Sequence, residues 1–362
     1  MMTIQQRSDE KRILAFEQAR VGASEFLGEG AWHTAWNVVI DGRDLVLRIP
    51  KDVAYGKPVP FDLEASRAEY EATKRYYEAV NEAVPGAAPD FFDYHVSAAV
   101  TYTVESFAGE PLSFHTLTDA QAVQIGIEVG AVYRKTDQIQ HGIDGLGYLT
   151  WTEDRGLHGS LDVALHELVR EESAEQLADY ATLCEQHPAF QDDLVNDVLH
   201  KVTTLRNERV HVPSLVNQDA SPENILLQHG RVRLIDPYPL VYTPLGMAGN
   251  FMNLYETAFV ALADTERYRK HRFASYESKL KAIAEGFLTG YSDGDTTIVR
   301  DVRGEQFLQL LEMTYQHHQL SRQAELTRAD VIRYGDMDAI TARLSELGRA
   351  LKPLALTYLA EH

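Results

Sequence analysis

Residues 214–240 read SLVNQDASPENILLQHGRVRLIDPYPL, which is the most strongly patterned stretch of the chain. The apolar runs ILL and VRLI are separated by a short polar connection that contains glycine, which is typical of a β-hairpin. Asp219 lies before the first run, Asn224 lies at its start, and Asp236 directly follows the second run. A hairpin would bring these three side chains to one edge of a small sheet.

These three side chains are the types that phosphoryl transfer requires. The reaction needs positioning and charge neutralisation, with a carboxylate to orient the acceptor hydroxyl and oxygen ligands for Mg²⁺. Asp and Asn before a strand also cap turns, so DASPEN alone would be interpreted as an ordinary loop. Together with the hairpin, the spacing predicts Asp219 as the catalytic base and Asn224 and Asp236 as Mg²⁺ ligands, as in kinases.

The charge balance limits the classes of partner. The chain has 362 residues, of which 34 are basic and 54 acidic, giving a formal net charge of −20. This excess of acid disfavours a nucleic-acid backbone or an anionic membrane, so we expect neither as a partner. It would suit a cationic substrate, although solubility or adaptation to salt also explains it.

The composition is that of an ordinary folded protein. Hydrophobic residues make up 44% of the chain and charged residues 24%, and the length allows two domains or one two-lobed domain. Cys184 is the only cysteine, which excludes an internal disulfide. The N-terminus is polar, and no run approaches the roughly 20 apolar residues of a membrane span. We therefore expect a cytoplasmic protein.

The first third of the chain predicts a small antiparallel sheet with one long helix. A short helix is expected at 9–20. The segment FLGEGAWHTAWNVVIDGRDLVLRIP then reads as strand, glycine turn, strand, hairpin and strand, with the tight turn at Asp41-Gly42. A helix is expected at about 62–83, and FFDYHV and AVTYTVESF predict two further strands.

The periodicity becomes mainly helical after SFAGEPL, which we interpret as a hinge at 106–112. Within the helical part, HGIDGLGYLTWTEDRG is expected to be a loop rich in glycine and acids. The sequence thus predicts an α+β fold. It has a β-rich N-lobe at 1–105 and a mainly helical C-lobe at 113–362, which includes the catalytic loop 216–227 and Asp236.

A glycine turn connects the first two predicted strands. Gly28 and Gly30 in GEGAWH would let backbone N–H groups approach phosphates closely, while His33 stands at the third position of the G-x-G-x-x-G pattern. Alone, the turn is more typical of a plain hairpin. Its position at the start of the β-rich lobe favours a phosphate loop.

Arg48 in LVLRIP stands where kinases place a Lys that pairs with nucleotide phosphates. Arg can bind phosphate through its planar fork, but it is not a simple substitute for Lys. In kinases a Glu of the following helix holds this cation, and here Glu71 is expected to pair with Arg48. Glu64 and Glu69 remain alternatives, and each of the three could equally belong to a solvated helix face.

Several ordered segments together resemble the aminoglycoside phosphotransferase superfamily, which includes choline kinase-like proteins. The segments are FLGEGAWHTAW, LVLRIP, the Glu-containing helix ending in VP, TVESFAGEPL and LVNQDASPENILL…VRLIDP. The string LRIPK is most similar to macrolide phosphotransferases. The resemblance covers about residues 24–110 and 214–255, and the block around Asp219 is its specific part.

The resemblance implies a bilobal protein-kinase-like fold with a nucleotide site. Asp219 would be the catalytic base, with Asn224 and Asp236 as Mg²⁺ ligands. The main chain around Glu105 to Phe107 would hold the purine. The phosphate loop and its partners would be Gly28, Glu29, Gly30, Ala31, Arg48 and Glu71.

The chain departs from the family pattern at several positions. The family usually has His-Gly before the catalytic Asp, acids in a later G-D-x-x-x-D-like element, and Leu-His in the first C-lobe helix. Those positions are occupied here by Asn217-Gln218, by Asn250 and Asn253, and by Val132-Tyr133. The departures leave open a degenerate member that binds nucleotide or ligand without catalysis.

The expected activity is ATP- or GTP-dependent transfer of a γ-phosphoryl group to a hydroxyl of a small molecule, with Mg²⁺ as cofactor. An acidic pocket drawn from GIDG and TWTEDRG could hold a polyamine, as in an antibiotic-resistance kinase acting on aminoglycosides. A sugar, an amino alcohol, a macrolide or another metabolite is a nearly equal alternative. No A-P-E-like segment follows Asp236, which argues against a protein kinase. The oligomeric state stays open.

Overall fold

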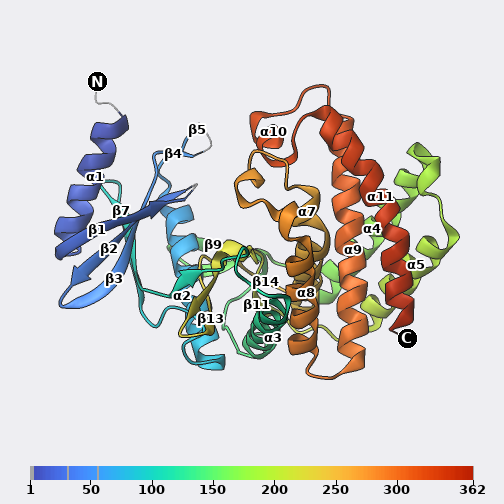
Figure 1. Ribbon diagram of the computed structural model, residues 1–362, viewed down its shortest axis with the longest axis horizontal. Coiled ribbons are helices and arrows are strands. Elements are labelled where there is room, and N and C mark those ends of the chain that lie inside the picture. Colours follow the sequence, from blue (N-terminus) through green and yellow to red (C-terminus); the bar gives the residue numbers. More distant parts are fainter. Residues whose placement is uncertain (1–3, 31, 55–56, 362) are drawn as a thin grey trace. The chain divides into compact units, whose positions relative to one another are not determined.

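The computed structural model describes residues 4–30, 32–54 and 57–361 (Figure 1). Its contacts divide the chain into two compact parts, which we call unit 1 and unit 2. Unit 1 comprises residues 1–112, 139–161 and 221–241, and unit 2 comprises residues 113–138, 162–220 and 242–362. The hairpin that follows Asn224 therefore groups with the N-terminal residues. The lobe boundaries expected around 106–112 remain a prediction.

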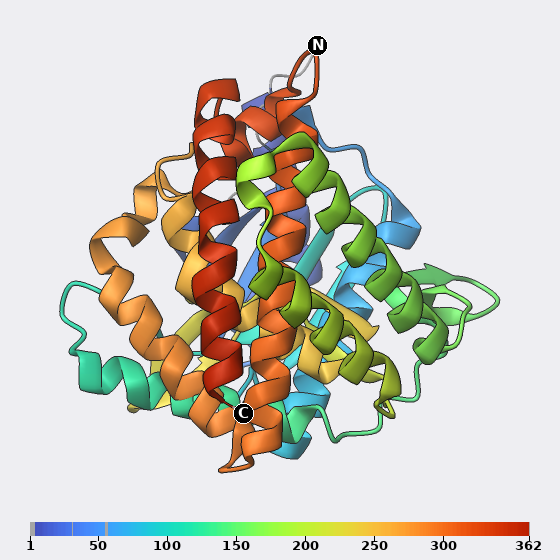
Figure 2. The ribbon, with the colours of Figure 1, turned by 90° about the vertical axis from the view of Figure 1, so that its right-hand side faces the viewer.

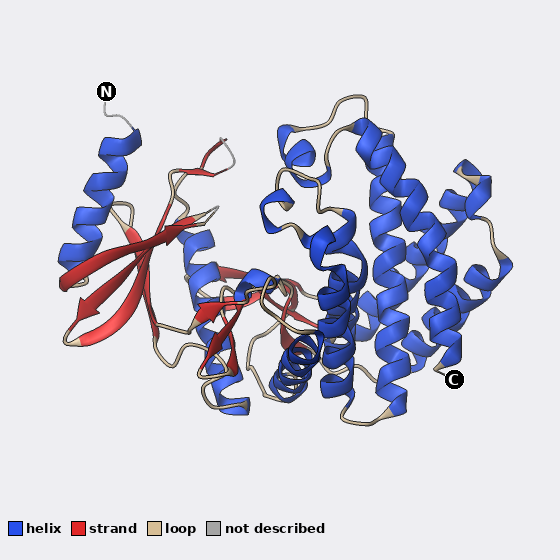
Figure 3. Ribbon diagram, viewed as in Figure 1, coloured by secondary structure: helices blue, strands red, loops and turns tan. Residues whose placement is uncertain are grey.

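Unit 1 is built around a five-stranded sheet whose neighbouring strands are all antiparallel (Figures 1 and 3). The strand order is β1 (Val21–Glu29), β2 (His33–Ile40), β3 (Arg43–Pro50), β7 (Thr101–Ser106) and β6 (Phe92–Val96). Helix α1 (Ile4–Gln18) packs on this sheet through Ala15, against a core that includes Trp36 and Leu47. The predicted strands and the short N-terminal helix are confirmed. The predicted turn at Asp41-Gly42 has positive φ at both residues, as a two-residue hairpin turn requires.

Helix α2 (Leu63–Ala83) follows two short strands, β4 (Val53–Ala54) and β5 (Lys57–Pro58). Its N-cap is Asp62, whose carboxylate accepts a hydrogen bond from the N–H of Ala65 at 3.0 Å. The buried face of the helix includes Tyr70, Tyr76 and Tyr77. This confirms the helix expected at about 62–83.

The hairpin predicted from the opening sequence is present. Strands β12 (Ile225–Gln228) and β13 (Arg231–Leu234) pair in antiparallel register, and β8 (Glu110–Pro111) pairs with the other edge of β12. His229 and Gly230 form the turn with φ of 52° and 75°. These left-handed values match a type I′ turn, which suits the twist of the strands.

The segment expected to be a loop at HGIDGLGYLTWTEDRG is a second hairpin, so that expectation was wrong. Strands β9 (Leu146–Thr152) and β10 (Gly156–Leu161) pair antiparallel, and β14 (Pro239–Tyr242) pairs with β9. A side chain at Gly159 would approach the main chain of Leu146 to 2.4 Å, so glycine is required for this pairing. The glycines that suggested a loop thus permit the close approach of two strands.

Unit 2 is mainly helical, and α4, α5, α9 and α11 lie side by side in it (Figure 2). They share a core that includes Leu183, Leu199, Phe307 and Leu347. Within the described residues, no helix is long and apolar enough to cross a membrane. The main elements are α3 (Asp119–Thr136), α4 (Leu165–Gln186), α5 (Asp193–Glu208), β11 (Ser214–Asn217), α6 (Pro244–Asn253), α7 (Phe259–Ala261), α8 (Glu277–Ser292), α9 (Thr296–Ser321), α10 (Arg328–Tyr334) and α11 (Met337–Ala360).

Helices α3 and α8 approach each other through glycines on both sides. A side chain at Gly126 or Gly130 would lie 2.1–2.2 Å from main-chain oxygens of α8, and one at Gly286 or Gly290 would lie 2.0–2.1 Å from main-chain oxygens of α3. Such contacts exclude any larger residue. The close packing places Tyr133 of α3 beside aromatic residues of α6 and α8.

Candidate functional site

Arg48 lies at the centre of a charged group in unit 1. Its Nη2 is 2.7 Å from Oε1 of Glu105 on β7, and its Nη1 donates to Oδ1 of Asp236, which follows β13. The side chain of Glu105 is 4% exposed, whereas that of Asp236 is 53% exposed. Nη2 of the guanidinium therefore contacts a buried carboxylate, and Nη1 contacts an exposed one.

Tyr77 of helix α2 completes this arrangement. Its hydroxyl donates to Oε2 of Glu105 at 3.4 Å and accepts from the main-chain N–H of Asp236 at 3.1 Å. Burial raises the pKa of Tyr77 well above its usual value, so the hydroxyl stays protonated. Burial also raises the pKa of Glu105, while the guanidinium of Arg48 opposes that shift. We call Arg48, Tyr77, Glu105 and Asp236 the Arg48 cluster.

Arg48→Met is expected to lower the free energy of unfolding by about 3–5 kcal/mol, because it leaves the buried carboxylate of Glu105 without its cation. Chemical denaturation measures the effect. Arg43→Met is the matched control on the same strand, since Arg43 lies over the ring of Phe91 and should contribute only about 1 kcal/mol. Equal losses from both variants would contradict the role given to Glu105.

The partner expected for Arg48 on helix α2 is different in the structure. Glu71 instead accepts hydrogen bonds from Nε of Arg75 at 3.0 Å and from the hydroxyl of Tyr94 at 2.9 Å. The alternative Glu69 interacts electrostatically with Asp236. Burial is the main cause that raises the pKa of Glu69 to about 7, and the negative charge of Asp236 adds to the rise. Glu64 stands in the exposed first turn. Sequence reasoning missed Tyr77, the residue that α2 contributes.

His33 stands at the third position of the glycine pattern and lies close to the Arg48 cluster. Burial lowers its pKa to about 4; the charge of Asp236 opposes this shift and that of Arg48 adds to it. Its Nε2 is 3.4 Å from the hydroxyl of Tyr70. The imidazole is therefore neutral at physiological pH.

The two predicted Mg²⁺ ligands of unit 1 are neighbours. Nδ2 of Asn224 donates to the main-chain oxygen of Asp236 at 3.2 Å, which leaves Oδ1 as the acceptor of the amide. Asp236 has a φ of 45°, a left-handed conformation that Asp tolerates better than most residues. In the described part of the chain, no three His, Cys, Asp or Glu side chains form a metal cluster. An amide and a carboxylate oxygen fit Mg²⁺, which keeps waters and phosphates as its other ligands.

The glycine turn provides open space above its backbone. A side chain at Gly28 would meet no atom within 4 Å, and one at Gly30 would only touch the main chain of His33 at 3.9 Å. Folding alone therefore gives no steric reason for glycine here, whereas close approach of a ligand does. Glu29 of the turn pairs with Lys51 at 2.9 Å. Ala31 lies outside the described residues.

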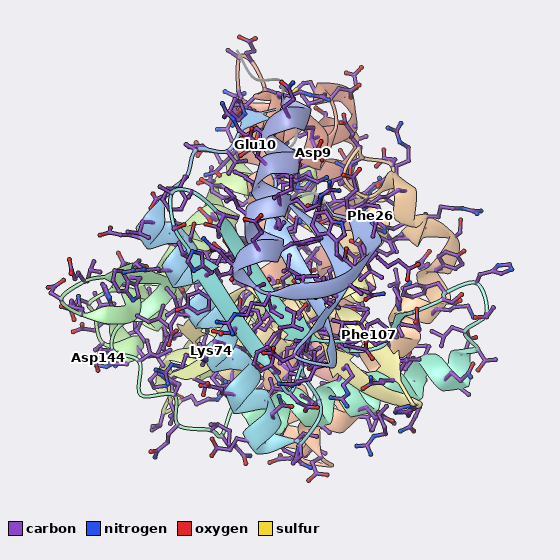
Figure 4. The ribbon with its side chains drawn as sticks, turned by 90° about the vertical axis from the view of Figure 1, so that its left-hand side faces the viewer. Asp9, Glu10, Phe26, Lys74, Phe107 and Asp144 are labelled. Carbon is purple, nitrogen blue, oxygen red and sulfur yellow. The ribbon has the colours of Figure 1, made fainter. Side chains whose placement is uncertain are left out.

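The segment expected to hold the purine is partly engaged already. The N–H of Ser106 donates to the carbonyl of Phe91 at 2.9 Å, and the carbonyl of Phe107 accepts from Nε2 of Gln228 at 3.2 Å. The side chain of Phe107 is exposed (Figure 4). The purine role of Glu105 and Phe107 stays a prediction.

Asp219 in unit 2 is held by Asn217. The main-chain N–H of Asp219 donates to Oδ1 of Asn217 at 3.1 Å, and Nδ2 of Asn217 donates to the main-chain oxygen of Asp219 at 2.9 Å and to the hydroxyl of Tyr133 at 3.3 Å. Asn250 donates to the carbonyl of Gln218 at 3.3 Å. The departures from the family pattern thus brace the loop of the proposed catalytic base.

Asn217→Ala should lower the free energy of unfolding by about 1–3 kcal/mol. It should also lower kcat about tenfold or more, because Asp219 loses the bonds that orient its main chain. Asn81→Ala is a matched control, since the side chain of Asn81 likewise bonds main-chain groups, those of Gly86, Ala88 and Pro89. The control should lose similar stability and keep its kcat; parallel losses of kcat would contradict the positioning role.

The sequence and the fold were compared with those of known proteins, and only the fold has similar counterparts. No protein-family model matches the sequence, and no curated protein sequence matches it. A crystal structure of aminoglycoside phosphotransferase APH(4)-Ia has a TM-score of 0.55 at 15% identity, covering 95% of this chain and 98% of that one. A mutant of the same enzyme, in a ternary complex with AMP-PNP and hygromycin B, has a TM-score of 0.54 at 16% identity, covering 94% and 97%.

A choline/ethanolamine kinase family protein from Mesorhizobium loti is similar as well, with a TM-score of 0.53 at 17% identity and coverage of 98% of both chains. At these identities the similarity shows the fold. The chain therefore has a fold similar to that of these aminoglycoside phosphotransferase and choline/ethanolamine kinase family structures, and the predicted α+β class is confirmed. The closer resemblance to macrolide phosphotransferases stays a prediction.

Proposed function

We propose that the protein is an ATP- or GTP-dependent phosphotransferase that acts on a hydroxyl group of a small molecule and uses Mg²⁺. The observation that carries this proposal is the adjacency of Asn224 and Asp236 beside the Arg48 cluster, on a fold shared with small-molecule kinases. That arrangement combines a guanidinium for phosphate oxygens with two oxygen ligands for a divalent cation.

In the proposed reaction, Asp219 orients the acceptor hydroxyl and takes its proton. The acceptor oxygen forms a bond to the γ-phosphorus while the bond to the bridging oxygen breaks, so the nucleoside diphosphate leaves. Asn224 and Asp236 would hold Mg²⁺, which when bound neutralises charge on the phosphates. Arg48 would offer its fork to phosphate oxygens, and Gly28 and Gly30 would offer main-chain N–H groups.

The chain itself limits how far the proposed base can lie from the metal ligands. Asp219 and Asn224 are five residues apart, and an extended chain of that length spans at most about 18 Å. The short helical turn at Pro222–Asn224, closed by a bond from the N–H of Asn224 to the carbonyl of Ser221 at 2.9 Å, shortens this span. This length of chain is compatible with the proposed roles of Asp219 and Asn224 in one reaction.

The acceptor predicted from the sequence is a hydroxylated molecule such as an aminoglycoside. The net charge of −20 favours a cation, and so do the acidic residues around β9 and β10. Of these, Asp144 lies before β9 with an exposed side chain (Figure 4). A sugar, an amino alcohol or a macrolide remains an alternative. Antibiotic resistance would follow only if the acceptor is an aminoglycoside or a macrolide.

A second function is favoured by one contact. Asp236, the proposed Mg²⁺ ligand, forms an ion pair with Arg48, and a metal ion would have to share that carboxylate with the guanidinium. A protein that binds nucleotide or another ligand without catalysis would tolerate this competition. Nucleotide binding is common to both proposals, and turnover separates them.

The test combines a thermal-shift assay with ATP or GTP and Mg²⁺ and a nucleotide-consumption assay against aminoglycosides, macrolides, sugars and amino alcohols. The kinase proposal expects stabilisation by nucleotide and acceptor-dependent consumption. Stabilisation without consumption by any acceptor would favour the binding protein. A chain that neither nucleotide stabilises would refute both.

A further inference from the structure

Two arginines in unit 2, Arg267 and Arg333, belong to segments that are joined by a main-chain hydrogen bond. The main-chain N–H of Arg267 donates to the carbonyl of Ile332 at 3.1 Å, which joins the loop after α7 to the residue before Arg333 on α10. The guanidinium of Arg267 lies 5.2 Å from the ring centre of Tyr268, and that of Arg333 lies 5.5 Å from that of Tyr334. Neither guanidinium forms an ion pair among the described residues. We call Arg267 and Arg333 the arginine pair.

The carboxylates around the arginine pair are engaged with other groups. Asp264 accepts from Nη2 of the buried Arg343 at 3.0 Å, and Glu266 pairs with Arg328 at 2.8 Å. Asp330 caps the start of α10 through the N–H and hydroxyl of Thr327. The positive charge of the arginine pair is thus left available, and the exposed side chains of Arg269 and Arg272 add to it.

A continuous line of packed rings leads from the arginine pair to the loop of Asp219 within unit 2. Ring centres are 5.9 Å apart for Tyr133 and Phe251 and 4.3 Å for Phe251 and Tyr255; the line then continues through Phe259 to Tyr268 at 5.3 and 6.0 Å. Tyr133 in turn accepts from Asn217, which braces Asp219. Asp219 and the arginine pair also both act on the pKa of Tyr268: the arginines lower it and Asp219 raises it, against a larger rise caused by burial.

Two buried polar atoms along this line make no hydrogen bond among the described residues. They are Oδ1 of Asn253 and the hydroxyl of Tyr255, from residues that are 5% and 0% exposed. Both belong to the stretch where α6 passes into a π-helical turn at Leu254–Ala258, a type of distortion that is frequent at functional sites. Buried groups of this kind normally bond to water or to a ligand.

We propose that the arginine pair binds an anionic group, a carboxylate or a phosphate, of the hydroxylated acceptor that Asp219 activates. This inference rests on the proposed phosphotransferase function and names an anionic substrate class in place of the cationic acceptor that the net charge favours. A guanidinium binds either oxyanion through two parallel hydrogen bonds, and the ring beneath each arginine holds its plane in place. The excess acid of the whole chain does not oppose this, because a local field depends on nearby charges rather than on the net charge.

The test compares matched acceptors that differ in one anionic group: glucose, gluconate and glucose 6-phosphate, and glycerol, glycerate and glycerol 3-phosphate, with an aminoglycoside as the cationic arm. We expect kcat/KM to be at least about tenfold higher for a carboxylate or a phosphate member than for its neutral partner. Arg267→Ala and Arg333→Ala should each raise KM for that acceptor about tenfold and leave KM for the nucleotide unchanged. Arg349→Ala is the control and should change neither KM, because this exposed arginine of α11 bonds the carbonyl of Ser345 in its own helix and leaves Glu266 paired with Arg328.

Each result decides the proposal. A neutral or cationic compound as the best acceptor, with a KM that Arg267→Ala leaves unchanged, overturns it. If no acceptor is phosphorylated, calorimetry with the same anionic compounds replaces kinetics. Binding to the wild type that Arg267→Ala weakens about tenfold supports the anion site. In that case only the proposed catalysis is refuted. Absence of such binding overturns the anion site itself.

Discussion

Asp219→Asn is expected to lower kcat by about two to four orders of magnitude while the affinity for nucleotide stays within about twofold of the wild type. The carboxamide keeps the shape and the main-chain bonds to Asn217, which involve the N–H and carbonyl of residue 219 and not its side chain. The variant lacks only the basic oxygen that accepts the proton of the acceptor. Steady-state kinetics with a coupled assay measures kcat, and calorimetry with a non-hydrolysable nucleotide measures binding.

Asp197→Asn is the matched control for this experiment. Asp197 is an exposed residue of α5 in the same unit, so its substitution should leave both kcat and nucleotide affinity unchanged. Turnover by Asp219→Asn at near the wild-type rate would refute the assignment of the base. A loss of nucleotide binding in that variant would instead point to a disturbed fold and would require thermal unfolding to be compared.

Asp236→Asn is expected to lower kcat at least about a hundredfold and to raise the Mg²⁺ concentration needed for half-maximal rate. The substitution removes one charged oxygen ligand next to Asn224 and one of the two anions that face Arg48. Stability should change little, because Asp236 is half exposed and the buried partner Glu105 remains in place. Titration of the rate with Mg²⁺ at saturating nucleotide measures the shift.

Asp44→Asn, an exposed position on the same strand as Arg48, provides the control and should show the wild-type Mg²⁺ dependence. An Asp236→Asn variant with unchanged Mg²⁺ dependence would remove Asp236 from the metal site. It would also favour the alternative in which the Arg48–Asp236 ion pair is purely structural. In either outcome, the behaviour of Asp219→Asn remains an independent test of the base.

The local elements of unit 1 could be predicted from the sequence because their signals are short-range. Apolar runs and tight turns containing glycine identified β2, β3, β12 and β13, and the helix expected at about 62–83 is α2. The hairpin β9–β10 was missed because its glycines and acids were interpreted as loop composition. In the folded chain the same glycines allow the two strands to approach each other.

The partner of Arg48 could not be predicted in this way. Glu69 and Glu71 are two residues apart on α2, so they point about 200° apart around the helix, and the rotation of that helix against the sheet decides which one faces the site. Glu105 and Asp236 are far from Arg48 in sequence, the latter by 188 positions. Their meeting depends on the pairing of β3 with β7 and on the position of the hairpin, which local periodicity does not encode.

By itself, the sequence determined the residue types of the proposed chemistry and the hairpin that brings Asn224 and Asp236 together, because both follow from spacing within a short segment. The tertiary structure alone decided that Glu105 and Asp236 hold Arg48, that Asn217 braces Asp219, and that Arg267 and Arg333 form no ion pair among the described residues. Arg48 and its partners, and likewise Arg267 and Arg333, come from segments remote along the chain, and Asn217 is itself bonded to Tyr133 of the distant helix α3. The formation of these contacts depends on strand register, on helix rotation and on close packing such as that of α3 and α8, which arise only when the whole fold excludes water from its core.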